Sequence, residues 1–185
     1  MPGAVEFSKQ GAVGVITVKN PPVNALSAAV RDGLMAGIQQ GNADNEVKAM
    51  VIVGDGRTFI AGADIREFGK PPSGTPLHDV VAAIEQRPKP VVAAIHGTAL
   101  GGGLEVALGC HYRYAVPKSM VGLPEVKLGL LPGCGGTQRL PRLVGAETAL
   151  DLIVNGTFVP APKARELGIV DETGEDLVGG AVAYA

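Results

Sequence analysis

The amino-acid sequence predicts an α/β fold with a largely parallel sheet. Short, wholly apolar segments typical of buried strands alternate along the chain with segments in which apolar residues recur at helical spacing. Glycines and prolines separate these segments and mark the turns between them. The 185 residues show no internal repeat, low-complexity tract or interdomain linker, so we expect a single domain over residues 1–185.

The first half of the chain contains two predicted strands and one predicted helix. Residues 13–18 are rich in β-branched side chains and are followed by two prolines, which is typical of a short strand. Ser27 is placed to cap a helix that extends to about residue 40, where Gly41 is expected to stop it. Residues 49–53 are wholly apolar and therefore predict a strand that is buried on both faces.

The second half continues the alternation. Residues 70–76 hold three prolines and predict a loop. The elements expected after it are a helix at residues 77–86, a buried strand at 91–95, a short helix at 104–108, strands at 112–116 and 120–123, and helices beyond Pro132, the last beginning near Glu175.

Charge and composition exclude several kinds of partner. Sixteen basic and 18 acidic residues give a net charge of -2, which favours neither nucleic acid nor an anionic membrane. The N-terminus lacks a secretory signal, and no apolar run approaches the ~18 residues that a membrane span needs. Cys110 and Cys134 favour reduced thiols over a disulfide, and neither the cysteines nor the three histidines show metal-ligand spacing. We therefore expect no metal site.

Two glycine-flanked turns indicate a backbone site for a negatively charged oxygen. Residues 101–103 are three glycines before a helix, whose N-terminal N–H groups favour an anion. Residues 61–64 form a second such turn, and two turns can aim two N–H groups at one carbonyl oxygen, as in an oxyanion hole. The alternative is a turn that serves packing alone. A dinucleotide-binding motif fits less well, because Val106 stands where its third glycine or alanine belongs.

Two glutamates lie in apolar stretches of the sequence. Glu105 is on the first turn of the helix after the glycine triplet, and Glu125 follows Pro124. Carboxylates are rarely buried without a partner or a purpose, and an apolar setting suits a carboxyl group to proton transfer near neutral pH. Taken singly, Glu105 could instead complement its helix dipole, and Glu125 could be a solvated loop residue. Their pairing favours an acid–base role.

Four motifs occur along the chain in a characteristic order and spacing. They are Ala61-Gly62-Ala63-Asp64-Ile65, Gly97-Thr98-Ala99-Leu100-Gly101-Gly102-Gly103-Leu104-Glu105, Gly122-Leu123-Pro124-Glu125 and Leu131-Pro132-Gly133-Cys134-Gly135-Gly136-Thr137-Gln138-Arg139-Leu140. Together they resemble the crotonase (enoyl-CoA hydratase/isomerase) superfamily, over about residues 7–171. Residues 20–25 and 107–113 resemble more narrowly the N-terminal hydratase part of bifunctional hydratase/3-hydroxyacyl-CoA dehydrogenases.

The resemblance implies a spiral of ββα units and a role for each residue of the site. The peptide N–H groups of Ala63 and Gly102 would hold the thioester oxygen of an acyl-CoA. Glu105 would activate a water molecule, and Glu125 would deliver a proton to the α carbon. The N–H of Gly133 would position the water. The implied reaction is the syn addition of water to trans-2-enoyl-CoA thioesters in fatty-acid β-oxidation.

The resemblance also implies how the CoA part is bound. Ala61, Asp64 and Ile65 would meet its adenine end, and because CoA is part of the substrate, no separate cofactor is expected. Two other functions stay open: a Δ3,Δ2-enoyl-CoA isomerase, which needs the oxyanion hole and chiefly one carboxylate, and an inactive acyl-CoA-binding module.

Assembly and location are expectations of the same kind. Members of the superfamily continue beyond the position where this chain ends, so we expect the C-terminal helical part to be truncated. The resemblance implies a homotrimer for the full-length protein, or fusion to a dehydrogenase part in a longer parent protein. A bacterial cytoplasm is the first expectation for the location, and the peroxisome is the alternative.

Overall fold

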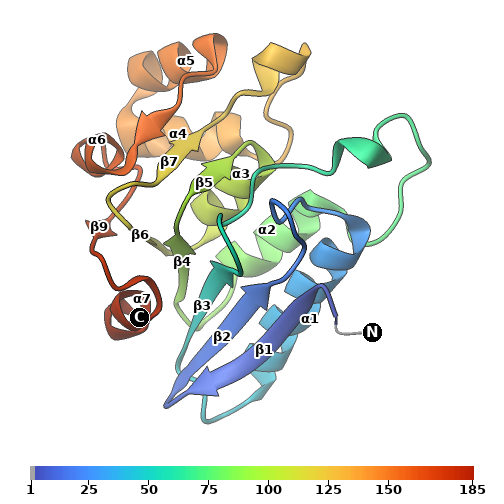
Figure 1. Ribbon diagram of the computed structural model, residues 1–185, viewed down its shortest axis with the longest axis vertical. Coiled ribbons are helices and arrows are strands. Elements are labelled where there is room, and N and C mark those ends of the chain that lie inside the picture. The colour runs from blue at the N-terminus through green and yellow to red at the C-terminus, as the bar shows by residue number, and fades with distance from the viewer. Residues whose placement is uncertain (1–2) are drawn as a thin grey trace.

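The computed structural model describes residues 3–185, which form two sheets flanked by helices (Figure 1). In the larger sheet only the first pair of strands is antiparallel, and each later pair of neighbours is parallel. The predicted α/β fold with a largely parallel sheet is therefore confirmed. The order of its six strands is β1 (Val5–Gln10), β2 (Val13–Val18), β3 (Ala49–Gly54), β4 (Val91–Ile95), β6 (Tyr112–Ala115) and β9 (Glu172–Thr173).

The smaller sheet carries the turns that build the pocket described below. It contains β5 (Thr98–Leu100), β7 (Met120–Gly122) and β8 (Val159–Pro160), with β5 parallel and β8 antiparallel to β7. The chain enters β5 shortly after leaving β4, so it passes from one sheet directly to the other. An isolated bridge between Ile60 and Ala99 ties the segment before the first glycine-flanked turn to β5.

Helices cover both faces of the larger sheet, and none in residues 3–185 has the length and apolar character needed to cross a membrane. The helical segments are α1 (Ala28–Ala43), η1 (Ile65–Glu67), α2 (Leu77–Glu85), α3 (Gly102–Gly109), η2 (Glu125–Leu128), α4 (Gly136–Val144), α5 (Ala146–Asn155), α6 (Ala161–Glu166) and α7 (Leu177–Tyr184), of which η1 and η2 are single 3₁₀ turns. Helices α1, α2 and α3 lie on one face of the larger sheet, and the last helix, α7, lies on the other (Figure 1).

Alternate residues of the central strands face two separate apolar cores. Along β3, Met50 and Ile52 point into the main core, whereas Val51 and Val53 point to the opposite face, where Ala181 of α7 covers them. This alternation follows from the strand geometry, in which successive side chains point to opposite sides. Because both faces are covered, β3 and β4 are buried throughout, as their apolar sequences predict.

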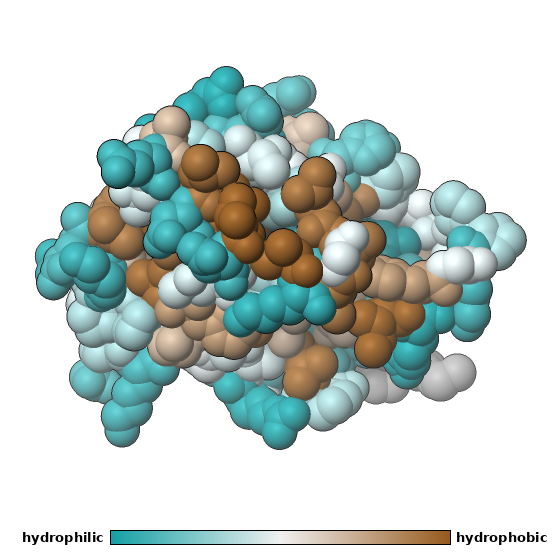
Figure 2. Space-filling model, turned by 90° about the horizontal axis from the view of Figure 1, so that it is seen from above, coloured by the Kyte–Doolittle hydropathy of each residue, from teal (hydrophilic) through white to brown (hydrophobic). Residues whose placement is uncertain are grey.

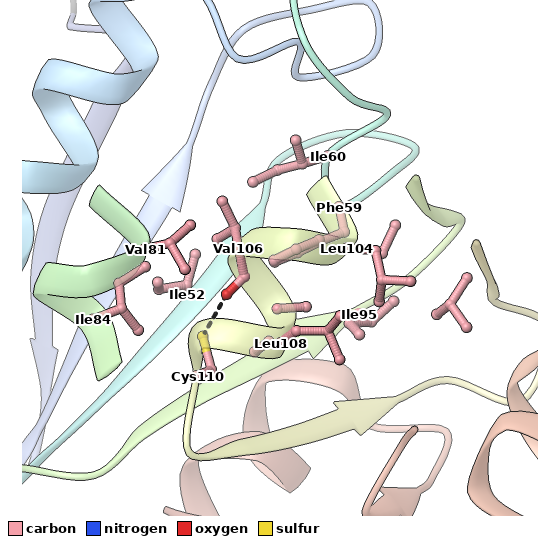
Figure 3. Close-up of a cluster of buried hydrophobic side chains, with 14 of the residues drawn as sticks. Ile52, Phe59, Ile60, Val81, Ile84, Ile95, Leu104, Val106, Leu108 and Cys110 are labelled. Carbon is pink, nitrogen blue, oxygen red and sulfur yellow. Dashed lines mark hydrogen bonds between the residues drawn. The ribbon is translucent and has the colours of Figure 1, made fainter. Parts of the chain in front are cut away.

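The main core joins the sheet to the helix that carries Glu105. Figure 3 shows Ile52 of β3 close to Val81 and Ile84 of α2, with Val106 and Leu108 of α3 beside them. All of these side chains are almost completely inaccessible to solvent. Burying an aliphatic side chain of this kind contributes about 1.5–3 kcal/mol. The packing therefore fixes α3 firmly relative to the sheet.

The structure differs from the sequence-based expectations at several boundaries. Gly41 does not stop α1, which continues to Ala43. Gly41 is buried where the helix passes close to Met50 and Phe7, so a side chain there would collide with them, and the glycine serves packing rather than termination. The edge strand β1 was not predicted, because only Val5 and Phe7 of its six residues are partly buried. The two-residue strands β8 and β9 are too short for a pattern.

Candidate active site

A pocket of about 250 Å³ lies where β5 turns into α3, and it brings together seven of the eight residues that the sequence analysis singled out. They are Ala61, Ala63, Ile65, Gly102, Glu105, Glu125 and Gly133. Asp64 is the exception and lines a neighbouring pocket of about 430 Å³, which it shares with Ala61, Ala63 and Ile65. The motifs are therefore close in space although they are distant in sequence.

The peptide N–H groups of Ala63 and Gly102 both lie at the pocket and have no hydrogen-bond partner within residues 3–185. Gly102 is the first residue of α3, where an N–H has no partner inside the helix. Ala63 forms a parallel bridge with Leu26, but that pairing uses the Gly62 carbonyl, which accepts from Leu26 N at 2.9 Å. The Ala63 nitrogen lies only 3.8 Å from the position that a Cβ on Gly102 would occupy. The two free donors thus lie side by side.

Glycine is required for different structural reasons at the first and last positions of the triplet. Gly101 adopts φ +53°, a conformation that residues with side chains rarely adopt. Gly103 packs so closely on the Ile60 backbone carbonyl that a Cβ could not be accommodated. Both features bring the first turn of α3 against the segment that leads to Ala63. Packing and the two-donor arrangement therefore depend on the same glycines, and the two interpretations of the triplet are compatible.

Glu105 is buried and tightly held. Its side chain is 3% exposed, and its Oε1 atom accepts hydrogen bonds from the N–H of Cys134 at 2.7 Å and from the N–H of Gly136 at 2.9 Å. Gly136 is the first residue of α4, so the carboxylate lies at the positive end of that helix. Two backbone donors and a helix N-terminus stabilise a negative charge at this position.

Glu125 is half-buried and held much more loosely. It is the first residue of η2, and its Oε2 atom is buried without a hydrogen-bond partner among residues 3–185. Burial raises the pKa of this carboxyl group, and the nearby charge of Glu105 raises it further. A Cβ on Gly101 would lie 3.2 Å from its Oε1 atom, so the carboxyl group lies over the turn that presents Gly102.

Cys134 contributes both a thiol and a backbone donor to the pocket. The thiol is free and half-buried, and burial together with the charges of Glu105 and Glu125 raises its pKa to about 11. From the sequence, Cys134 was expected to be a reduced thiol within the fourth motif, with no contact to Glu105. The two hydrogen bonds from the N–H groups of Cys134 and Gly136 to Glu105 were not predicted, because a backbone donor is not visible in residue type.

Asp64 forms an ion pair within its own turn. Its carboxylate accepts from Arg66 at 2.9 Å and 2.7 Å and caps η1 through the Arg66 N–H. These bonds from Arg66 lower the pKa of Asp64 to about 2. The neighbouring Ile65 side chain is 68% exposed. The three residues expected to contact CoA thus include one that shapes the loop and one that presents an apolar surface.

The mouth of the pocket is apolar. Its wall includes Phe68, Leu128, Leu130 and Leu131, all of which are exposed in part. Figure 2, a view from above, shows apolar side chains gathered across this face of the molecule. None of these four was predicted to line the pocket, because an apolar side chain in a loop carries no sign of its role; Leu131 was noted only as the first residue of the fourth motif. Within residues 3–185 no cluster of three or more His, Cys, Asp or Glu could hold a metal ion.

Comparison with known proteins places these observations in context. Residues 8–182 match the family described as "Enoyl-CoA hydratase/isomerase". The chain is 54% identical over 164 residues to a "Peroxisomal bifunctional enzyme" of Danio rerio, covering 89% of this chain but 23% of that relative. It is 43% identical to a "Probable enoyl-CoA hydratase" of Bacillus subtilis, covering 94% of this chain and 70% of the relative.

Solved structures agree with the sequence matches. An enoyl-CoA hydratase from Bacillus anthracis superposes with a TM-score of 0.90 at 33% identity, covering 98% of this chain and 74% of that one. An enoyl-CoA hydratase from Polaromonas superposes with a TM-score of 0.92 at 27% identity, covering 98% and 76%. The chain thus spans about a quarter of the bifunctional relative and about three quarters of these structures.

Proposed function

The chain belongs to the enoyl-CoA hydratase/isomerase family, and from that premise we propose that it adds water across the double bond of 2-enoyl-CoA thioesters. The observation that carries the proposal is the meeting, in one pocket, of two carboxyl groups and two peptide N–H groups that have no partner within residues 3–185. That set supplies a cradle for a negatively charged oxygen and two sites that can exchange protons.

The N–H groups of Ala63 and Gly102 would hold the thioester oxygen. Water addition pushes electrons from the double bond onto that oxygen, so its negative charge is largest in the transition state. Donors fixed in advance stabilise such a charge without reorganising, and losing one donor typically costs ~10²–10³ in rate. Support comes from the close approach of the two turns and from the absence of any competing partner for either N–H in residues 3–185.

Glu105 and Glu125 would divide the proton transfers. Glu105, stabilised as a carboxylate, would take a proton from water while the water oxygen bonds to the β carbon. Glu125, whose pKa is raised by burial, would hold a proton and give it to the α carbon on the same face. One proton returns from Glu105 to Glu125 after each turnover, so the site is restored. In this scheme the Gly133 N–H, at the pocket wall, would orient the water.

The CoA portion would extend over the loop after Ala61. The neighbouring pocket of about 430 Å³ shares Ala61, Ala63 and Ile65 with the reaction pocket and continues along residues 20–23. A thioester held at Ala63 could therefore have its adenine end in the second pocket, against the backbone of Ala61 and the side chain of Ile65. Asp64 would act mainly by keeping this turn in shape through Arg66.

Isomerisation is the second candidate reaction. Moving one proton from the γ carbon to the α carbon needs the oxyanion hole and one carboxyl group that gives and takes a proton. Glu125 fits that single role, because its Oε2 atom is buried beside the donor turn and has no partner within residues 3–185. Hydration is favoured, because Glu105 is held by dedicated backbone donors that isomerisation would not require.

Assembly and location are part of the same proposal. One relative is named as peroxisomal and another is a hydratase of a bacterium, so we keep the peroxisome and a bacterial cytoplasm as the two proposed locations. A homotrimer, or a fused dehydrogenase part in a longer parent protein, is proposed from the family resemblance alone.

An absorbance assay with crotonyl-CoA tests the proposed reaction. Hydration removes the conjugated double bond and bleaches the enoyl thioester absorbance, whereas isomerisation of a 3-enoyl-CoA creates that absorbance. A double variant, Glu105→Gln with Glu125→Gln, is the matched control, because it keeps the size of both side chains and removes their proton capacity. Binding of crotonyl-CoA without bleaching by the unmodified protein would reject the hydratase and leave a binding module.

A further inference from the structure

Arg139 connects two helices to the loop of residues 130–135, which carries the Cys134 N–H that bonds to Glu105. Its guanidinium group forms a two-pronged ion pair with Glu85, with Nε to Oε1 at 3.0 Å and Nη2 to Oε2 at 2.7 Å. Its Nη1 atom donates to the carbonyl oxygen of Cys134 at 3.1 Å. Glu85 is the last residue of α2 and Arg139 lies in α4, so the arginine joins two helices to one loop carbonyl.

Cys134 is consequently held at both of its backbone polar groups. Its N–H donates to Glu105 Oε1 at 2.7 Å, and its carbonyl accepts from Arg139. Apart from a bond between Leu130 N and the Glu125 carbonyl, these are the hydrogen bonds that anchor residues 130–134 within the described chain. The position of the donor that faces Glu105 therefore depends on Arg139.

Gly135 provides the space that this contact needs. It adopts φ +98°, and a Cβ at this position would overlap Nη1 of Arg139. The Arg139 side chain is 20% exposed, whereas Arg142, one turn later on the same helix, bonds to Gln138 alone among the described residues. Of these two arginines of α4, Arg139 bonds to both Glu85 and the Cys134 carbonyl, whereas within residues 3–185 Arg142 bonds to neither.

We propose that Arg139, braced by Glu85, is a positioning residue that holds the Cys134 N–H against Glu105 and so keeps the general base in place. This inference rests on the proposed hydratase function for its effect on rate, but its effect on the loop does not depend on any activity. A planar guanidinium can satisfy a carboxylate and a carbonyl at the same time, which an ammonium group cannot reproduce with the same geometry.

The kinetic test compares Arg139→Ala with Arg142→Ala as the matched control. Small displacements of a reacting group cost up to ~10²-fold in rate. We expect Arg139→Ala to lower kcat for crotonyl-CoA by ~10-fold or more with KM within about twofold, because Arg139 does not line the pocket. Arg142→Ala should retain kcat. Glu85→Gln should lower kcat in the same direction, and adding it to Arg139→Ala should cause little further loss.

Hydrogen exchange measured by mass spectrometry separates this inference from the proposed function. In Arg139→Ala, the peptide covering residues 131–137 should exchange ~10-fold faster, since the Cys134 and Gly136 N–H groups lose protection. A peptide from β3 should be unchanged, and Arg142→Ala should match the unmodified protein in both.

If the unmodified protein lacks hydratase activity but residues 131–137 exchange faster in Arg139→Ala, the proposed function is rejected, whereas the positioning role of Arg139 is supported. Unchanged exchange and unchanged kcat in a folded Arg139→Ala would overturn the brace. If Arg139→Ala does not fold, the same two measurements on Glu85→Gln decide the question, and no change in either would overturn it.

Discussion

Glu105 and Glu125 line the same pocket but are held in different ways. Glu105 is almost fully buried, and its Oε1 atom accepts two backbone hydrogen bonds at the N-terminus of α4. Glu125 is half-buried on a single 3₁₀ turn, and its Oε2 atom has no partner within residues 3–185. One carboxyl group is thus fixed by its surroundings, and the other is free to exchange its proton.

The difference shows that the environment, rather than the residue type, assigns the two roles. A base that takes a proton from water benefits from a stable negative charge and a fixed direction. An acid that protonates carbon benefits from a raised pKa, which burial gives to Glu125. Four predictions test this contrast.

The largest effect is expected for Glu125→Gln. The proposed mechanism places Glu125 nearest the α carbon in both hydration and isomerisation, so both activities should fall. Loss of a general acid or base typically costs ~10²–10⁴ in rate. Rates with crotonyl-CoA and with a 3-enoyl-CoA are to be measured after folding and CoA binding have been verified. If either reaction proceeds at the unmodified rate, Glu125 is not the shared proton carrier.

Glu105→Gln should separate the two reactions. The amide oxygen can still accept from Cys134 and Gly136, so the loop should stay in place while the proton-accepting capacity is lost. Hydration should fall by ~10²–10⁴, whereas part of any isomerisation should survive through Glu125. Full hydration by a folded Glu105→Gln would contradict the two-carboxylate mechanism and favour the isomerase.

Gly102→Pro tests the peptide N–H donors of the oxyanion hole, which both proposed reactions need. Proline is tolerated at the first position of a helix but lacks an N–H, so turnover should fall by ~10²-fold or more. Gly102→Ala is the control: its Cβ would crowd Leu77 and Leu26 at 2.9 Å and 3.0 Å, as the proline ring would, but its N–H remains. Equal losses in the two variants would attribute the effect to crowding rather than to the lost donor.

The smallest effect concerns stability and pH. Because burial raises the pKa of Glu125 in the folded state, ionising this carboxyl group costs more in the folded protein than in the unfolded chain. Its contribution to the free energy of unfolding is therefore fully present below the unfolded pKa, and it is lost as pH rises through the folded pKa. Glu125→Gln removes this penalty, so its Tm relative to the unmodified protein should increase between about pH 4 and pH 7. Thermal unfolding at both pH values measures this, and a difference that does not change with pH would argue against a raised pKa.

The sequence predicts the chemical groups of the site better than the hydrogen bonds and ion pairs that hold them in place. Oxyanion donors need glycine-flanked turns, and proton transfer needs carboxylates in apolar surroundings, so residues 61–64, 101–105 and 125 could be found from residue type and spacing. The bonds from Cys134 and Gly136 to Glu105 could not, because any residue other than proline offers the same N–H. The Arg139–Glu85 pair joins positions 54 residues apart that form no motif together.

For the fold as well, features set by local sequence were predicted, and features set by tertiary contacts were not. The buried strands β3 and β4 were predicted because both faces are covered, which leaves a continuous apolar run. The error at Gly41 arose because a glycine near a helix end usually marks its stop, whereas here the close approach of Met50 decides. A buried strand can therefore be recognised from local sequence, whereas the role of Gly41 depends on which side chains pack against it.

The raised pKa of Cys134 has a further consequence for a pocket that would handle enoyl thioesters. The β carbon of such a compound is an electrophile that thiolates attack readily, and an alkylated Cys134 would block the pocket. At pH 7 a thiol with a pKa of about 11 is ionised in only about one molecule in 10⁴. Burial, together with the negative charge of Glu105, would therefore keep this nucleophile unreactive beside its own electrophilic substrate, so that water rather than sulfur adds to the double bond.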